Sequence, residues 1–125
     1  MINVLLVAAG GAMGSVLRYL VGVLSTRWFG PAFPWGTLTV NVVGSFAIGF
    51  LAEVIARRFN ASVELRFFLV TGILGGFTTF SSFSLDTAVL FERGAFTATA
   101  AYLSASLCLS LAAVFAGLAL GRAMF

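Results

Sequence analysis

Several chemically useful residues are missing from this chain of 125 amino acids. It has no histidine, which is the commonest proton shuttle and metal ligand at neutral pH. Its one cysteine, Cys108, excludes an internal disulfide and any metal site built from several cysteines. Lysine is also absent, so every positive side chain is an arginine. These absences remove most of the side chains from which enzymes and metal sites are usually built.

Charge is scarce as well, because only 9% of the residues are charged and 61% are hydrophobic. A soluble domain has about 25% charged residues and about 45–50% apolar ones. The arginines are spread along the chain, whereas a nucleic-acid surface would gather them on one face. The composition therefore indicates a single membrane domain, residues 1–125, whose charges lie mainly at the ends of its spans.

Four stretches are long and apolar enough to cross a bilayer, which takes about 20 residues of helix. They are Ile2 to about Thr26, Trp28 to Ala52, Phe67 to Leu85 and Gly94 to Gly121. Pro31 and Pro34 mark the first connection as a loop, and the connections 53–66 and 86–94 carry most of the charges. Helices satisfy every backbone group inside lipid, so we expect an all-α membrane protein with four transmembrane helices. The first stretch could instead be a signal peptide, although its apolar character continues too far for one.

The arginines near the span ends give only a weak preference for one orientation, since positive residues favour the cytoplasmic side. With four spans, the N-terminus, the second connection and the C-terminus lie on the same side of the membrane. That side has four arginines, Arg57, Arg58, Arg66 and Arg122, and the other side has two, Arg27 and Arg93. The chain could therefore insert in both orientations. One small chain also has too few helices to enclose several polar faces, so we expect a homodimer or a larger assembly.

In the first span, Gly10, Gly14, Arg18 and Gly22 recur every four residues and share one helix face. Small residues at this spacing let helices pack closely. A charge inside a membrane is a candidate functional residue by default. Arg18 either reaches the interface, binds backbone carbonyls, or lies at the mouth of a pore.

Polar residues also recur every four positions in the second and fourth spans. Asn41 lies with Thr37 and Ser45 on one face of the second span. An amide in hydrocarbon is costly unless it is bonded, so Asn41 either bonds another helix or donates to an anion. In the fourth span the hydroxyls of Tyr102, Ser106 and Ser110 are aligned. They either form a hydrated track or bond carbonyls of their own helix.

The segment "GGFTTFSSFS" (residues 75–84) lies in the third span. Its glycines weaken a helix, so the span is predicted to break near its middle. Freed carbonyls of broken membrane helices can bind cations. Phe80 and Phe83 share one face after the break, surrounded by Ser81, Ser82 and Ser84. Aromatic edges are positive and can approach an anion, although both rings could equally face lipid or the core.

These faces offer N–H, O–H and aromatic-edge groups but no carboxylate inside a span, which favours the passive movement of a dehydrated anion. Two rival interpretations stay open. A small multidrug-type transporter has four spans too, but needs an intramembrane carboxylate to exchange protons for cationic drugs. A non-transporting subunit of a membrane assembly would explain the glycine faces, but not the hydroxyls and phenylalanines.

Three motifs resemble the CrcB/Fluc family of small fluoride channels: "GGAMGSVLRY" (10–19), "WGTLTVNVVGSFAIG" (35–49) and "GILGGFTTFSSFS" (72–84). The sequence departs from the family pattern at Ser15, where Ala is usual, and at Ser82, which replaces a Thr and keeps the hydroxyl. The resemblance implies a passive, fluoride-selective channel that exports cytoplasmic fluoride, confers fluoride resistance and has no enzymatic activity. It also implies a dual-topology, antiparallel homodimer with two pores in the inner cell membrane.

The resemblance also implies roles for particular residues. A structural sodium ion at the dimer centre would be bound by the backbone carbonyls of Gly75 and Thr78, and Arg18 matches the family's first-span arginine. The fluoride pore would be lined by Asn41, Phe80, Phe83, Ser81, Ser82, Ser84, Tyr102, Ser106 and Ser110. The implied partners are fluoride, sodium, membrane lipid and a second copy of the chain, with no nucleic acid.

Overall fold

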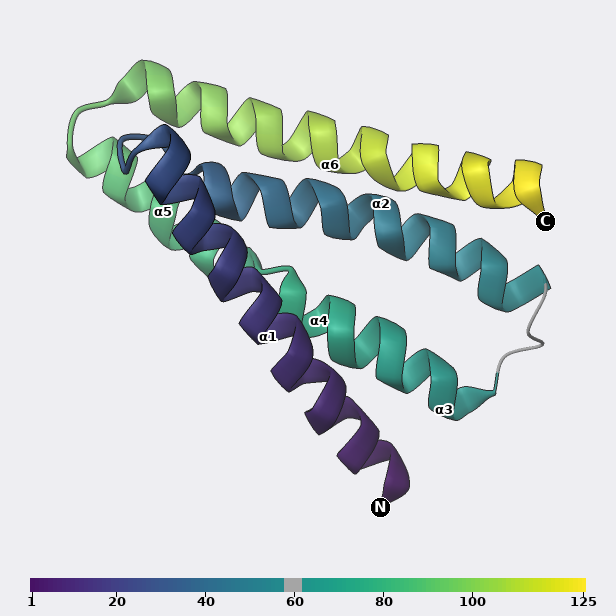
Figure 1. The fold of residues 1–125 in the computed structure, drawn as a ribbon. Helices are drawn as coiled ribbons and strands as arrows, with labels where there is room; N and C mark the ends of the chain where they lie inside the picture. The colour runs from purple at the N-terminus through teal and green to yellow at the C-terminus, as the bar shows by residue number, and fades with distance from the viewer. Residues whose placement is uncertain (58–61) are drawn as a thin grey trace.

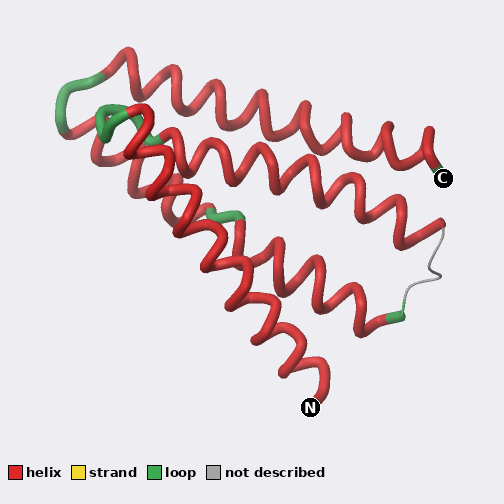
Figure 2. The backbone as a smooth tube through the Cα atoms, viewed as in Figure 1, coloured by secondary structure: helices red, strands yellow, loops and turns green. Residues whose placement is uncertain are grey.

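Helices account for nearly all of the part of the chain that the computed structural model describes, residues 1–57 and 62–125 (Figures 1 and 2). Three crossings are single helices: α1 (Ile2–Phe29), α2 (Trp35–Arg57) and α6 (Phe96–Met124). The third crossing is composite, and consists of α3 (Val63–Arg66), the π-helical stretch η1 (Phe67–Leu74), α4 (Gly75–Phe77) and α5 (Phe80–Glu92). The four segments are long and apolar enough to cross a membrane, which confirms the predicted number of spans.

Several of the predicted boundaries were wrong. The second span was expected from Trp28, but α1 continues through Trp28 and α2 begins at Trp35, directly after the loop that contains both prolines. The third span was expected to end at Leu85, but α5 continues to Glu92, so most of the connection 86–94 is helical. It is helical because Leu90, only 2% exposed, packs in a core cluster with Tyr102 of α6. Charged side chains at helix ends can reach the membrane interface, so helices extend beyond the apolar runs.

The four crossings alternate in direction, so the termini lie at one end of the molecule together with the last turn of α2 and the first turn of α3 (Figure 1). α2 packs along α6, and α1 packs against η1 and α4. Arg57 and Arg122 lie in the last turns of α2 and α6, at the same end of the molecule as the C-terminus. Arg27 lies in the last turn of α1 and Arg93 directly follows α5, both at the opposite end. Arg58, which was counted in the orientation prediction, lies outside the described residues.

Glycines allow α1 to lie directly against the third crossing, as the four-residue spacing predicted. A Cβ atom on Gly10 would lie 2.6 Å from the backbone oxygen of Phe68, and one on Gly14 would overlap the backbone oxygen of Ile73. Both glycines are buried. Because the opposing atoms belong to backbone, no side-chain movement could make room for a larger residue at either position.

The close contact at Gly14 predicts a stability difference between two neighbouring glycines. Gly14→Ala should destabilise the protein by about 1–3 kcal/mol, the usual cost of overpacking. Gly11→Ala is the matched control, because its Cβ atom would meet nothing within 4 Å. That control should be neutral or stabilising by up to about 1 kcal/mol, since alanine favours helix. The measurement is the monodisperse fraction in detergent after stepwise heating, and equal losses in both variants would contradict the packing.

Candidate functional site

The third crossing is interrupted at two residues. Thr78 (φ −87°, ψ 159°) and Thr79 (φ −156°, ψ 124°) are extended, and α5 begins immediately after them (the loop within the third crossing in Figure 2). The sequence predicted a break in this segment but attributed it to the glycines. Gly75 and Gly76 are instead helical, because Gly76 is a packing residue whose Cβ atom would lie 2.5 Å from the backbone oxygen of Gly11.

The interruption releases backbone carbonyls that an unbroken helix would satisfy with the amide four residues later. In an unbroken helix the amide of Thr79 would donate to the carbonyl of Gly75, but here it donates to Asn41 Oδ1 at 2.8 Å. In an unbroken helix the amide of Ser82 would donate to the carbonyl of Thr78. Here it donates to Thr79 Oγ1 at 3.1 Å, so the Thr79 side chain caps the start of α5. The carbonyls of Gly75 and Thr78 therefore lose their helical partners.

Arg18 supplies a partner for a third released carbonyl. The helical partner of Gly76 would be the amide of Phe80, on the far side of the break, and Arg18 Nε donates to the Gly76 oxygen at 3.0 Å. A cation is also favourable at the C-terminal end of a helix, where carbonyls point outward. Of the three interpretations that the sequence left open for Arg18, the structure supports binding to backbone carbonyls.

Asn41 bonds both backbone groups of one residue in the break. Its Nδ2 donates to the Thr79 oxygen at 3.0 Å while its Oδ1 accepts from the Thr79 amide. The amide side chain thus pairs with the backbone as a neighbouring strand would, and fastens α2 to the break. This is the cross-helix hydrogen bond that the sequence allowed, and it leaves the second N–H of Nδ2 available, since an amide nitrogen carries two donors.

A cavity of about 400 Å³ lies beside the break, between α2, the third crossing and α6. The predicted pore residues that line it are Asn41, Phe80, Phe83, Ser106 and Ser110, together with Gly75 and Thr78. Ser106 Oγ is buried and has no hydrogen-bond partner among the described residues. The lining within the described part of the chain carries no formal charge.

The three serines of α5 lie outside this lining. Ser81 Oγ is 3.2 Å from Thr79 Oγ1, and Ser84 Oγ donates to the backbone oxygen of Phe80 at 3.1 Å. Ser82 uses its backbone amide to meet the capping oxygen of Thr79. Sequence reasoning missed this central role of Thr79, although a threonine directly before a helix is a frequent N-cap and could have indicated it.

Tyr102 is fully buried and lines neither cavity, but it contacts residues that line each of them. Its hydroxyl donates to Asp86 Oδ2 at 3.2 Å. Its ring centroid is 5.2 Å from that of Phe83, which lines the cavity beside the break, and 5.5 Å from that of Phe33. Phe33 and Asp86 line a second cavity of about 310 Å³ near the α1–α2 loop, with Thr37 and Arg93. Sequence reasoning missed Asp86 and Phe33, although a buried tyrosine hydroxyl usually requires a partner.

Comparisons with known proteins agree on one family. A sequence model described as CrcB-like protein, Camphor Resistance (CrcB), matches residues 5–118. A relative from Agrobacterium fabrum is 70% identical over the full length of both chains, and one from Rhizobium etli is 66% identical over 99% of each. A relative from Rhizobium leguminosarum bv. trifolii is 67% identical over 99% of each chain. All three carry the name fluoride-specific ion channel FluC.

The two hydrogen bonds of Asn41 predict that its loss loosens the break. Asn41→Leu removes both bonds, so hydrogen exchange of a peptide covering residues 78–84 should accelerate about tenfold or more, because each buried bond contributes roughly 1 kcal/mol. Asn41→Asp should accelerate it as well, since a carboxylate oxygen would then face the Thr79 oxygen. Ser45→Ala is the control, because Ser45 lines the same cavity one helical turn away. Unchanged exchange in Asn41→Leu would contradict the fastening role.

Proposed function

The chain belongs to the CrcB family, and from that membership we propose that it is a passive, fluoride-selective channel that exports cytoplasmic fluoride. Relatives that match it from end to end are named fluoride-specific ion channels. Those names describe a channel, which fits a protein without enzymatic activity. A membrane potential that is negative inside would drive an anion outward with about 2.3 kcal/mol per 100 mV, so no energy-coupling site is required.

The observation that carries the proposal is the set of groups that meet in the cavity beside the break. Asn41, Ser106 and Ser110 contribute N–H and O–H groups, and Phe80 and Phe83 contribute aromatic rings. Donors of this kind can replace the hydration shell of an anion. The described lining of this cavity has no carboxylate, and Asp86, which lines the second cavity, accepts the hydrogen bond of Tyr102. Proton-coupled exchange of cationic drugs is not favoured, because the relatives are named fluoride-specific ion channels. A non-transporting assembly subunit is not favoured either, because the relatives are named channels.

The donors in the cavity differ in how free they are to meet an ion. Ser106 Oγ is the most available, because it is buried and has no partner among the described residues. Asn41 retains one N–H after bonding the break. Beyond the cavity, Tyr102 would continue the route toward the second cavity, and Ser81, Ser82 and Ser84 would complete the polar lining on α5. The proposed pore therefore consists of nine residues: Asn41, Phe80, Ser81, Ser82, Phe83, Ser84, Tyr102, Ser106 and Ser110.

We also propose that two copies assemble as a dual-topology homodimer with two pores, in the inner cell membrane. Phe80 borders the cavity and is 76% exposed in the single chain, which leaves it a surface for a second copy. Gly75 and Thr78 both border the cavity, and their carbonyls have lost their helical partners, so these carbonyls suit a hard cation that prefers oxygen ligands. Bound there at the dimer centre, sodium would take the released carbonyl oxygens as ligands and so satisfy them.

Fluoride efflux from liposomes tests the proposal, with a fluoride electrode as the readout and chloride efflux as the comparison. The purified protein should release fluoride rapidly and chloride negligibly. Phe80→Ile should slow fluoride efflux about tenfold, which corresponds to about 1.4 kcal/mol on the barrier, because an aliphatic side chain offers an anion no positive edge.

Phe115→Ile is the matched control for that variant. Phe115 is also exposed, at 67%, and lies on α6 away from the cavity lining. It should leave efflux within about twofold of the unmodified protein. The absence of fluoride efflux from well-folded protein would exclude the channel, and equal losses in the two variants would exclude the proposed role of Phe80.

A further inference from the structure

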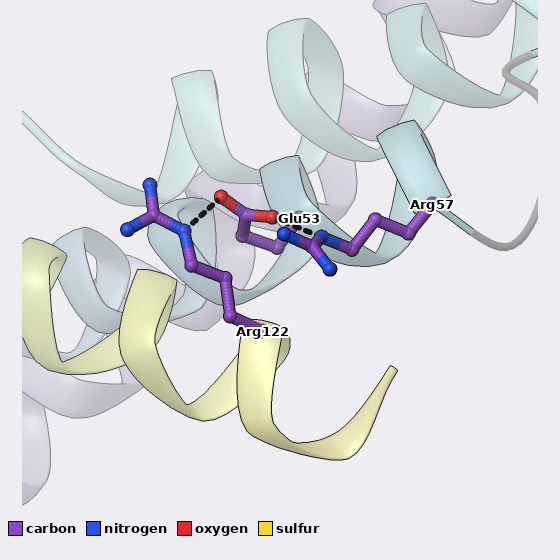
Figure 3. A network of polar contacts seen from close by, with 3 residues as sticks. All are labelled: Glu53, Arg57 and Arg122. Carbon is purple, nitrogen blue, oxygen red and sulfur yellow. Dashed lines mark hydrogen bonds and ion pairs between the residues drawn. The ribbon is translucent and has the colours of Figure 1, made fainter.

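Three charged side chains form a network where α2 and α6 end (Figure 3). Glu53 Oε2 accepts a hydrogen bond from Arg57 Nε at 2.9 Å, and Glu53 Oε1 accepts one from Arg122 Nε at 2.8 Å. The carboxylate is largely covered, with 14% of its side chain exposed, whereas the arginine side chains are 48% and 59% exposed. One shielded anion therefore holds two accessible cations.

Close packing of the two helices brings the arginines together. A Cβ atom on Gly121 of α6 would lie 2.6 Å from Cβ of Glu53, so the helices nearly touch at this level. Arg57 follows Glu53 by one helical turn, and Arg122 is the residue after Gly121. Both guanidinium groups thus reach the same carboxylate from two different helices, one on each side of it (Figure 3).

A link between α2 and α6 does not explain why two arginines bind the same carboxylate. Exposed ion pairs contribute little to stability, and one arginine would be enough to make one. Each arginine donates to Glu53 through Nε, and both terminal nitrogens of Arg122 point away from the carboxylate (Figure 3). The network therefore presents two positive charges against one negative charge, and the planar fork of N–H donors of Arg122 is directed outward (Figure 3).

The position of the network in the membrane indicates which kind of molecule lies next to the arginine N–H donors. Arg57 lies in the last turn of α2 and Arg122 in the last turn of α6, which are both membrane-spanning helices. Helix ends of this kind lie at the level of lipid headgroups, where basic residues attract anionic lipids. Leu120 and Met124 beside Arg122 are apolar and 41% and 57% exposed, as expected of a surface in contact with acyl chains.

We propose that Arg57 and Arg122, held in place by Glu53, bind the phosphate of an anionic glycerophospholipid. Arginine forks match phosphate oxygens in pairs of parallel hydrogen bonds, whereas lysine offers only a point charge. The excess of positive charge favours a headgroup with net negative charge, such as phosphatidylglycerol, over a zwitterionic one whose own cation would face the arginines. The acyl chains lie along the apolar surface of α6.

Native mass spectrometry of the purified protein tests the proposal by counting bound phosphatidylglycerol and phosphatidylcholine during titration. The unmodified protein should retain phosphatidylglycerol preferentially. Arg122→Gln should weaken that retention about fivefold, since each arginine near an anionic surface contributes about one kcal/mol. Arg57→Gln/Arg122→Gln should weaken it further, and Arg122→Lys should restore it only in part.

Arg27→Gln is the control, because it removes one positive charge from the opposite end of the molecule. It should change retention by less than about twofold. Equal retention by the unmodified protein and Arg122→Gln would overturn the proposal, and so would displacement of the lipid by millimolar inorganic phosphate, which would identify a soluble anion as the ligand. If Arg122→Gln does not fold, the single variant Arg57→Gln takes its place in the same retention measurement. None of these measurements involves fluoride flux, so their outcome is independent of the proposed function.

Discussion

Inside a membrane, a broken helix must find partners for the backbone groups that the break releases, because lipid offers none. The rest of this structure depends on how that requirement is met at Thr78 and Thr79. Asn41 bonds both backbone groups of Thr79, and Arg18 bonds the carbonyl of Gly76. The two side chains come from different helices, so α1 and α2 together hold the break in its conformation. The break is therefore a property of the packed bundle as much as of the third crossing.

Close contact between backbones is what brings those side chains within reach. A Cβ atom on Gly14 would overlap the third crossing, and one on Gly44 of α2 would overlap the side chain of Thr78. Helices in lipid gain no hydrophobic energy by associating, so their association depends on close packing and on hydrogen bonds between them. In this molecule the two depend on each other, because the glycines that allow the packing also place Asn41 and Arg18 at hydrogen-bond distance from the break.

The hydroxyls of the spans fall into two groups that the sequence alone does not distinguish. Thr87, Thr99 and Ser84 each donate to the carbonyl four residues earlier in their own helix. Ser106 also lies within a membrane-spanning helix, yet it is buried at the cavity with no partner among the described residues. An unsatisfied hydroxyl in a low-dielectric site is costly, which makes this position the strongest support for an ion or water in the cavity.

The sequence by itself determined the class of protein, the four crossings, the interruption of the third and the family, because apolar length, glycine spacing and motifs are local properties of the chain. It also placed Asn41 on a helix face with Ser45, as the cavity lining confirms. Only the tertiary structure decided that the break lies at the threonines, that Arg18 bonds Gly76, and that Tyr102 pairs with Asp86. Periodicity specifies which residues share a face, but not which helix lies opposite. The bonds that hold this site join residues 38 and 58 positions apart, so they exist only after the helices pack.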